Sequence, residues 1–294
     1  MSGIVVHIGY RKTGTTTLQK NLFAKHPDLV SIGKPTISND GAEFLEFLTA
    51  PGADEGKLKS LKAVWERMHE GAKSSTIVLS NEGLSHYRHY PSDRNWVLGD
   101  RLRDLFDQPK VMITIRNQVD LVESLYIHLA KRGSYRSIDD WVDEQRDKEI
   151  ANLDFHRAAR YFAGHFGAGN VGIFSLEQWA KHPKAFAEGV AQFLNIDARR
   201  TESLLARSVE NRRKSQRYML YLAIRSRLPI GSMAGLLRNS WTSRFQNFIA
   251  GGRPARSRLP DPVRAELAGM FARSNADLSR EFGIELRSYG YPID

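Results

Sequence analysis

Short runs of apolar residues recur along the first two thirds of the chain, and longer amphipathic stretches separate them. Runs rich in Ile, Val and Leu are typical of strands buried in a parallel sheet. The longer stretches repeat their apolar residues every three or four positions, which is the period of a helix. We expect strands at residues 4–8, 29–32, 76–80, 110–115 and 171–174, and helices at 15–25, 41–49, 55–72, 94–106, 138–145, 155–166, 185–194 and 262–282, with another around 121–129.

Because strands and helices alternate in this way, an α/β fold with a parallel sheet is expected. At 294 residues the chain is long enough for one large α/β domain. We therefore predict a single domain over 1–294. Its α/β core should occupy 1–200, and a basic, mainly helical portion should occupy 201–294.

The first strand leads into a loop that has the pattern of a phosphate cradle. Gly9 and Gly14 bound the loop with four residues between them, and a run of threonines then begins a helix. Backbone N–H groups in such a loop, together with the positive end of the helix dipole, can hold an anion. The expected sheet is therefore of the P-loop type. The alternative is a glycine-containing turn that binds nothing.

The position of the lysine separates this loop from that of a nucleotide triphosphatase. The triphosphatase pattern G-x-x-x-x-G-K-[ST] has its lysine directly after the second glycine. Here that position is Thr15, and the lysine is Lys12, two residues before Gly14. The ammonium group is thus delivered from the loop instead of the helix, which weakens an ATPase interpretation.

Charged residues follow two later strands at their carboxyl ends, where open parallel sheets hold their ligands. Glu82 comes after the strand at 76–80, and its carboxylate could take a proton from a hydroxyl. Arg116 comes after the strand at 110–115, with Ser124 eight residues later on the next helix, and guanidinium forks suit phosphate oxygens. Glu82 could instead be a cap or a solvent-exposed residue, and Arg116 could simply cover the edge of the sheet.

The segment YRKTGTTTLQ resembles the 5′-phosphosulfate-binding loop of the sulfotransferases, which use 3′-phosphoadenosine-5′-phosphosulfate (PAPS). This resemblance implies that Lys12 contacts the bridging oxygen of the sulfuryl donor and takes part in catalysis. It also implies a 5′-phosphate site made by neighbouring loop residues, namely Arg11, Lys12, Thr13, Gly14, Thr15, Thr16 and Thr17.

Three further elements extend the resemblance. The pair Arg116 and Ser124 resembles the motif that binds the 3′-phosphate of PAPS. The glutamate in Ser-Asn-Glu at 80–82 resembles the base of carbohydrate sulfotransferases, and His86 is the reserve because cytosolic small-molecule members use a histidine. Arg253 lies where family members close a glycine-and-basic loop over the sulfuryl donor.

A sulfotransferase of a bacterial, carbohydrate-directed type is therefore implied. It would move a sulfuryl group from PAPS to a hydroxyl on a carbohydrate or glycolipid and release adenosine 3′,5′-bisphosphate, with no metal. Two alternatives stay open from the residues alone. One is a P-loop nucleotide kinase or phosphotransferase, and the other is a non-catalytic polyanion-binding protein.

The composition of the chain limits the kinds of site it can contain and the cellular location that is expected. The chain has no cysteine, which excludes disulfides and cysteine-zinc sites, and it has no apolar run long enough to span a membrane. No basic-then-apolar leader precedes the first strand, so a cytoplasmic location is expected.

The net charge of +10 is concentrated in one block, because residues 211–260 contain eleven Arg and Lys and no Asp or Glu. This block could be a helical lobe packed on the core, a contact for the acceptor or nucleotide, or a peripheral contact with the anionic inner membrane surface. A specific nucleic-acid partner is not expected, and the oligomeric state stays open.

Overall fold

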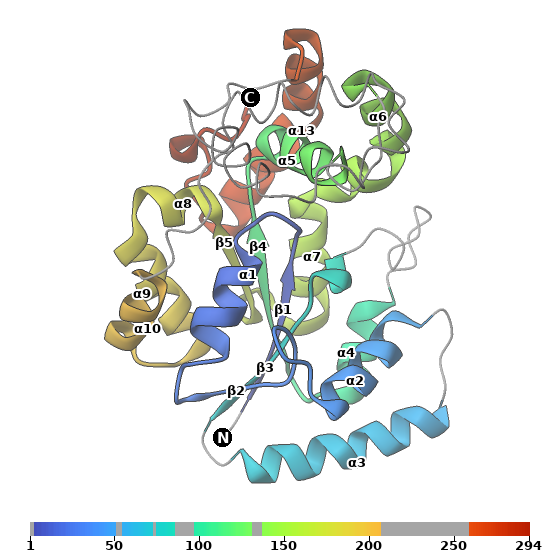
Figure 1. Ribbon diagram of the computed structural model, residues 1–294, viewed down its shortest axis with the longest axis vertical. Helices are drawn as coiled ribbons and strands as arrows, with labels where there is room; N and C mark the ends of the chain where they lie inside the picture. The colour runs from blue at the N-terminus through green and yellow to red at the C-terminus, as the bar shows by residue number, and fades with distance from the viewer. Residues whose placement is uncertain (1–2, 51–54, 73–74, 86–96, 131–136, 207–258) are drawn as a thin grey trace, which may run out of the picture.

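The computed structural model describes residues 3–50, 55–72, 75–85, 97–130, 137–206 and 259–294. Its centre is a five-stranded parallel sheet with the order β2-β3-β1-β4-β5 (Figure 1). The strands are β1 Ile4–Gly9, β2 Leu29–Ser31, β3 Thr76–Ser80, β4 Lys110–Ile115 and β5 Val171–Ser175. The predicted α/β class with a parallel sheet is confirmed.

The register of the sheet aligns the carboxyl ends of its central strands. In β1, His7 pairs with Ser80 of β3 and with Met112 of β4, and Gly9 pairs with Thr114. Since all the strands are parallel, the segments that follow β1, β3 and β4 leave from the same edge. In Figure 1 this edge faces α5 Gln118–Ala130 and α13 Asp261–Phe282.

Alternate residues of the strands face two separate apolar layers. In β1, Ile4, Val6 and Ile8 contribute to one layer, while Val5 contributes to the other. This alternation is the period-2 pattern of a strand covered on both faces. Both faces of the sheet are therefore buried by helices.

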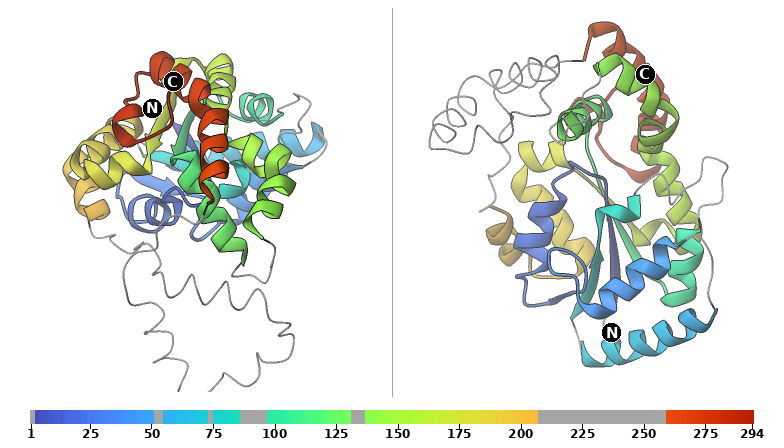
Figure 2. Two further views of the ribbon diagram at one scale, coloured as in Figure 1. Left: turned by 90° about the horizontal axis from the view of Figure 1, so that it is seen from above. Right: turned by 45° about the vertical axis from the view of Figure 1, so that its right-hand side comes forward.

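The helices divide between the two faces, as the views in Figure 2 show. The layer that contains Val5 packs against α9 and α10, and the larger layer packs against α4 and α7. The helices not yet given bounds are α1 Thr15–Thr17, α2 Asn39–Thr49, α3 Glu55–Gly71, α4 Leu98–Leu105, α6 Ile138–Gln145, α7 Phe155–Phe166, α8 Leu176–Lys181, α9 Pro183–Leu194 and α10 Ala198–Ala206.

Two elements differ from the sequence prediction. The helix expected at 15–25 is a single α-helical turn that continues as the π-helix Leu18–Phe23. The helix expected at 94–106 has its described part at Leu98–Leu105. The π-helix places Leu18, Leu22 and Phe23 in the same apolar layer as Val5, so packing on the sheet accompanies the wider turn.

The C-terminal part of the described chain packs into the apolar layer on one face of the sheet. Helix α13 places Leu267, Phe271 and Leu278 in the larger apolar layer, where they join residues of α5 and α7. The last residues form a short 3₁₀ turn, Arg287–Tyr289. Within the described ranges, no helix has the length and apolar character that crossing a membrane requires.

Candidate active site

The glycine-bounded loop at residues 9–14, which we call the phosphate loop after its sequence pattern, joins β1 to α1 at the carboxyl edge of the sheet. Its backbone turns through left-handed conformations at Lys12, with φ of 68°, and at Gly14, with φ of 88°. The Thr13 hydroxyl donates a hydrogen bond of 2.6 Å to the Tyr10 carbonyl and so closes the loop from within. A loop of this shape, directed into the first turn of a helix, can hold an anion.

Both glycines that bound the loop are required: a Cβ at Gly9 would lie 2.2 Å from Thr15 Cγ2, and Gly14 has a left-handed backbone. Its positive φ is strained for other residues, and a Cβ atom there would lie 3.0 Å from the ring of Trp179. The carbonyl of Gly14 accepts the N–H groups of Thr17 and Leu18, at 3.0 and 3.3 Å. The helix therefore begins at Thr15, and its first N–H groups face the loop.

A buried polar network lies under the phosphate loop. His7 Nδ1 lies 2.8 Å from the Ser80 hydroxyl, and His7 Nε2 lies 3.2 Å from the Thr114 hydroxyl. Thr114 in turn contacts the Thr13 hydroxyl at 2.9 Å, and Gln19 donates to Ser80 at 3.1 Å. Burial lowers the pKa of His7 to about 3, so this ring is neutral at physiological pH. The network thus connects the loop to three central strands.

Glu82 lies directly beside the phosphate loop. It begins the 3₁₀ turn Glu82–Ser85, two residues after the end of β3. The Thr15 hydroxyl donates a hydrogen bond to Glu82 Oε1. Ser85 of the same turn donates to the Gly9 carbonyl at 3.2 Å. A carboxylate at this position can accept a proton from a group bound near the loop.

Lys34 is a member of this cluster that sequence reasoning missed. Its Nζ lies 3.4 Å from Glu82 Oε2, and its backbone N–H donates to the Ser80 carbonyl at 2.9 Å. Lys34 follows β2 just as Glu82 follows β3. The strand-end rule that selected Glu82 could have selected Lys34 as well.

Arg116 and the phosphate loop also meet. Arg116 follows β4, and its Nη1 donates to the Lys12 carbonyl at 3.4 Å. Ser124 lies on α5, eight residues further along the chain, and is half-buried. Arg11, Lys12, Thr16 and Thr17 are at least partly accessible to solvent, whereas Thr13 and Thr15 are buried. The residues selected from three strand ends therefore surround one edge of the sheet.

A small hollow opens beside Glu82 on the side of α5. Its lining is mixed, with apolar side chains and two carboxylates: Tyr10, Arg11, Glu82, Ser85, Leu121, Leu125, Glu149, Asn152 and Leu153. Asn152 donates to the Ser85 carbonyl at 2.6 Å, which ties the far wall of the hollow to the Glu82 turn. The hollow is small, about 10 Å³, which is room for about one water molecule or one hydroxyl group beside the Glu82 carboxylate.

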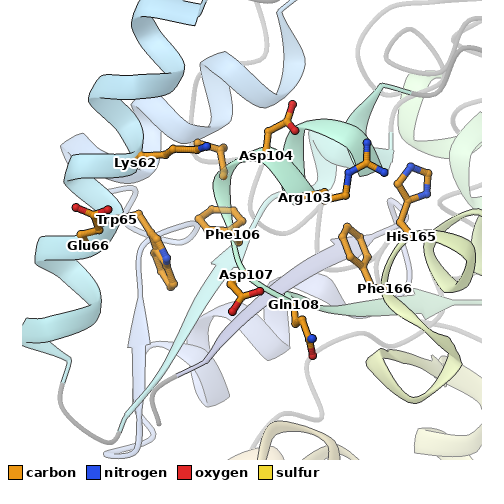
Figure 3. Close-up of a pocket in the computed structure, with 11 residues that line it drawn as sticks. Lys62, Trp65, Glu66, Arg103, Asp104, Phe106, Asp107, Gln108, His165 and Phe166 are labelled. Atoms are coloured by element: carbon orange, nitrogen blue, oxygen red, sulfur yellow. The ribbon is translucent and has the colours of Figure 1, made fainter.

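A larger cavity, of about 670 Å³, lies elsewhere on the molecule (Figure 3). Residues of α3, the segment before β4 and the end of α7 form its walls, among them Trp65, Phe106 and Phe166. These segments lie at the amino edge of the sheet, about one strand length, or ~20 Å, from the phosphate loop. Because of this distance, the larger cavity is not part of the candidate site around Glu82.

Two predicted site residues, His86 and Arg253, lie outside the described residues. Within the described part of the chain, no group of three His, Asp or Glu side chains could hold a metal ion.

The strand order of the sheet, the loop after β1 and the charged residues at the strand ends together define an α/β protein of the P-loop type. A model of the sulfotransferase domain matches residues 4–238, so this chain belongs to the sulfotransferase family. The family and the fold assign sulfuryl transfer as its class of reaction. The predicted family is thereby confirmed. The sequence matches no curated protein.

A solved structure shows the same fold. A sulfotransferase from Alicyclobacillus acidocaldarius is 15% identical, with 98% of each chain covered and a TM-score of 0.59. Two sulfotransferase domains are also 15% identical. The one from the Synechococcus PCC 7002 olefin synthase has a TM-score of 0.46, with 92% of this chain and 95% of that chain covered. The one from the curacin biosynthetic pathway has a TM-score of 0.48, with coverage of 92% and 98%.

Proposed function

We propose that this protein transfers a sulfuryl group from PAPS to a hydroxyl of a saccharide or glycolipid and releases adenosine 3′,5′-bisphosphate. One observation carries the proposal: a candidate base and both candidate phosphate-binding elements meet at one edge of the sheet. The Thr15 hydroxyl donates to the Glu82 carboxylate, and Arg116 donates to the Lys12 carbonyl. Glu82 and Arg116 are thus each joined by one hydrogen bond to a residue at the phosphate loop.

The residues present fit a sulfuryl donor that carries two phosphate groups. The cradle needs a glycine at position 14, and the first helical N–H groups face it. Lys12 adds an ammonium group from within the loop. Arg116 follows β4 and supplies a guanidinium fork for the 3′-phosphate, with Ser124 on the helix that begins beside it. A nucleotide with phosphates at its 5′ and 3′ positions could place one phosphate on each of these two elements.

PAPS supplies the sulfuryl group: the bond from sulfur to the 5′-phosphate oxygen breaks while the acceptor oxygen bonds to sulfur, and the acceptor loses its proton. Glu82 takes that proton, while the Thr15 hydroxyl and the Lys34 ammonium hold its carboxylate in place. Lys12 and the loop N–H groups stabilise the negative charge that grows on the departing phosphate. Groups of this kind contribute about 10²- to 10³-fold in rate each.

The acceptor hydroxyl reaches Glu82 at the hollow beside it, which at about 10 Å³ has room for a hydroxyl group but not for a whole sugar ring. Leu121, Leu125 and Leu153 line the hollow but are almost fully buried, so they offer the acceptor little surface. Glu149 and Asn152 offer hydrogen-bonding groups for neighbouring hydroxyls.

Two measurements test the proposal. Calorimetry should show that the protein binds adenosine 3′,5′-bisphosphate more tightly than ATP–Mg²⁺. A transfer assay with radiolabelled PAPS, run across saccharide, glycolipid, phenol and alcohol acceptors, should label a saccharide or glycolipid. Preference for ATP–Mg²⁺ would instead favour a phosphotransferase, and transfer to phenols alone would overturn the acceptor class.

A further inference from the structure

Asn117, the residue after Arg116, is held by contacts with three separate elements. Its carbonyl accepts the N–H of Leu121 at 2.8 Å, and its side-chain oxygen accepts the N–H of Val119 at 3.0 Å. Both bonds cap the start of α5. Its side-chain nitrogen donates to the carbonyl of Gly290 at 2.7 Å. Asn117 therefore connects the start of α5 to the C-terminal segment, which we define as residues 286–294.

The third contact is with Glu177 on α8. Glu177 Oε1 accepts the backbone N–H of Asn117 at 3.1 Å, and Oε2 accepts the hydroxyl of Tyr291 at 2.8 Å. Burial raises the pKa of Glu177, while its hydrogen bonds and the charge of Arg116 act in the opposite direction. Both carboxylate oxygens act as acceptors, which is what the ionised form offers.

The C-terminal segment is itself anchored firmly. Tyr291 is 3% exposed, and Leu286 is fully buried in the core. The carbonyl of Pro292 accepts a bond of 3.0 Å from Asn275, which also exchanges two hydrogen bonds with Gln118, at 2.7 and 3.1 Å. Asn275 and Gln118 have no exposed surface. The segment thus connects α13 and α5 next to the turn that carries Arg116.

These contacts converge on the turn between β4 and α5. Arg116 lies in this turn and reaches the phosphate loop, while Asn117 lies next to it and has little freedom to move. We propose that Glu177 and Tyr291 are positioning residues for the 3′-phosphate of the sulfuryl donor. Through Asn117 they hold Arg116 where it can bind that phosphate. This inference rests on the proposed function, because it assigns a ligand to Arg116.

Glu177→Gln is the primary test variant. A glutamine keeps the size of the side chain but removes its charge, and only its oxygen can accept, so it cannot accept from Asn117 and Tyr291 on separate oxygens as Glu177 does. Tyr291→Phe removes only the hydroxyl and is the second variant. Glu188→Gln is the matched control, because Glu188 is exposed on α9 and pairs only loosely with Lys184, at 3.9 Å.

Calorimetry with two nucleotides separates positioning from general damage. Adenosine 3′,5′-bisphosphate and adenosine 5′-monophosphate differ only in the 3′-phosphate. Glu177→Gln should bind the bisphosphate about tenfold more weakly, a factor that corresponds to about 1.4 kcal/mol. Its affinity for the monophosphate should stay within twofold of wild type. In the transfer assay, the KM for PAPS should rise about tenfold while kcat changes less than twofold.

The outcomes are distinct. If wild type prefers the bisphosphate and both variants keep that preference in full, the positioning role is overturned. The same holds if a folded variant loses affinity for both nucleotides equally, since a purely structural role predicts that result. If wild type does not distinguish the two nucleotides, the proposed sulfuryl donor is overturned, and this inference with it.

Discussion

His7 gives a prediction whose size follows from the structure. Its ring is fully buried beneath the phosphate loop and contacts Ser80 and Thr114. Burial lowers its pKa to about 3, whereas a histidine in an unfolded chain titrates near 6.5. Below pH 6.5 the unfolded chain therefore gains a proton that the folded protein does not accept. Stability should be lost as the pH falls from 6.5 toward 3.

The expected loss follows from proton linkage. Between the two pKa values, each pH unit by which the pH falls lowers the free energy of unfolding by about 1.4 kcal/mol. From pH 7 to pH 5 the loss from this one residue is about 2 kcal/mol, since the titration has only begun at pH 6.5. Solvent does not screen this effect, because the ring has no exposed surface.

His7→Gln removes the titrating ring and keeps a hydrogen-bonding side chain of similar size. At pH 7 the variant should be less stable than wild type by about 1–3 kcal/mol, because it cannot satisfy both hydroxyl partners equally well. Toward pH 5 the gap should close by about 2 kcal/mol. His182→Gln is the control: its ring is exposed, and the unfolding free energy at pH 7 should stay within about 0.5 kcal/mol of wild type.

Urea unfolding at pH 7, 6 and 5, followed by tryptophan fluorescence, measures these gaps. The difference between wild type and variant cancels all other titrating groups that the two share. With a slope of about 3 kcal/mol per M, the 2 kcal/mol closure appears as a relative shift of about 0.7 M in the urea midpoint. A gap that stays constant from pH 7 to pH 5 would refute the argument that burial keeps His7 neutral.

Three further predictions concern the loop and the base. Lys12→Ala should lower transfer about 10²- to 10³-fold with an unchanged thermal midpoint, because the side chain is exposed; normal transfer would favour a polyanion-binding role for the protein. Glu82→Gln should lower kcat by about 10²-fold or more and leave affinity for adenosine 3′,5′-bisphosphate within about twofold, and full activity would remove Glu82 as the base. Gly14→Ala should destabilise the fold by about 1–3 kcal/mol, measured by thermal unfolding, since its φ is +88° and its Cβ would press on Trp179; an unchanged midpoint would contradict this.

The sequence by itself determined the elements whose signals are local. Apolar runs located the five strands, because a strand buried on both faces needs adjacent apolar residues. The spacing of Gly9 and Gly14 located the loop, and the rule that ligands lie at carboxyl ends of parallel strands selected Glu82 and Arg116. All these signals lie within about ten residues of the feature they predict.

Only the tertiary structure decided which distant residues meet. The sheet order placed His7 between Ser80 and Thr114, which are 73 and 107 positions away, and brought Lys34 to Glu82 across 48 positions. It also joined Tyr291 to Glu177, 114 positions apart. Such contacts depend on which strands become neighbours and how the helices pack, and these depend on burial summed over the whole chain. A local sequence pattern does not show which distant segments will be buried together. The partners of Lys34, His7 and Glu177 therefore could not be predicted from the sequence.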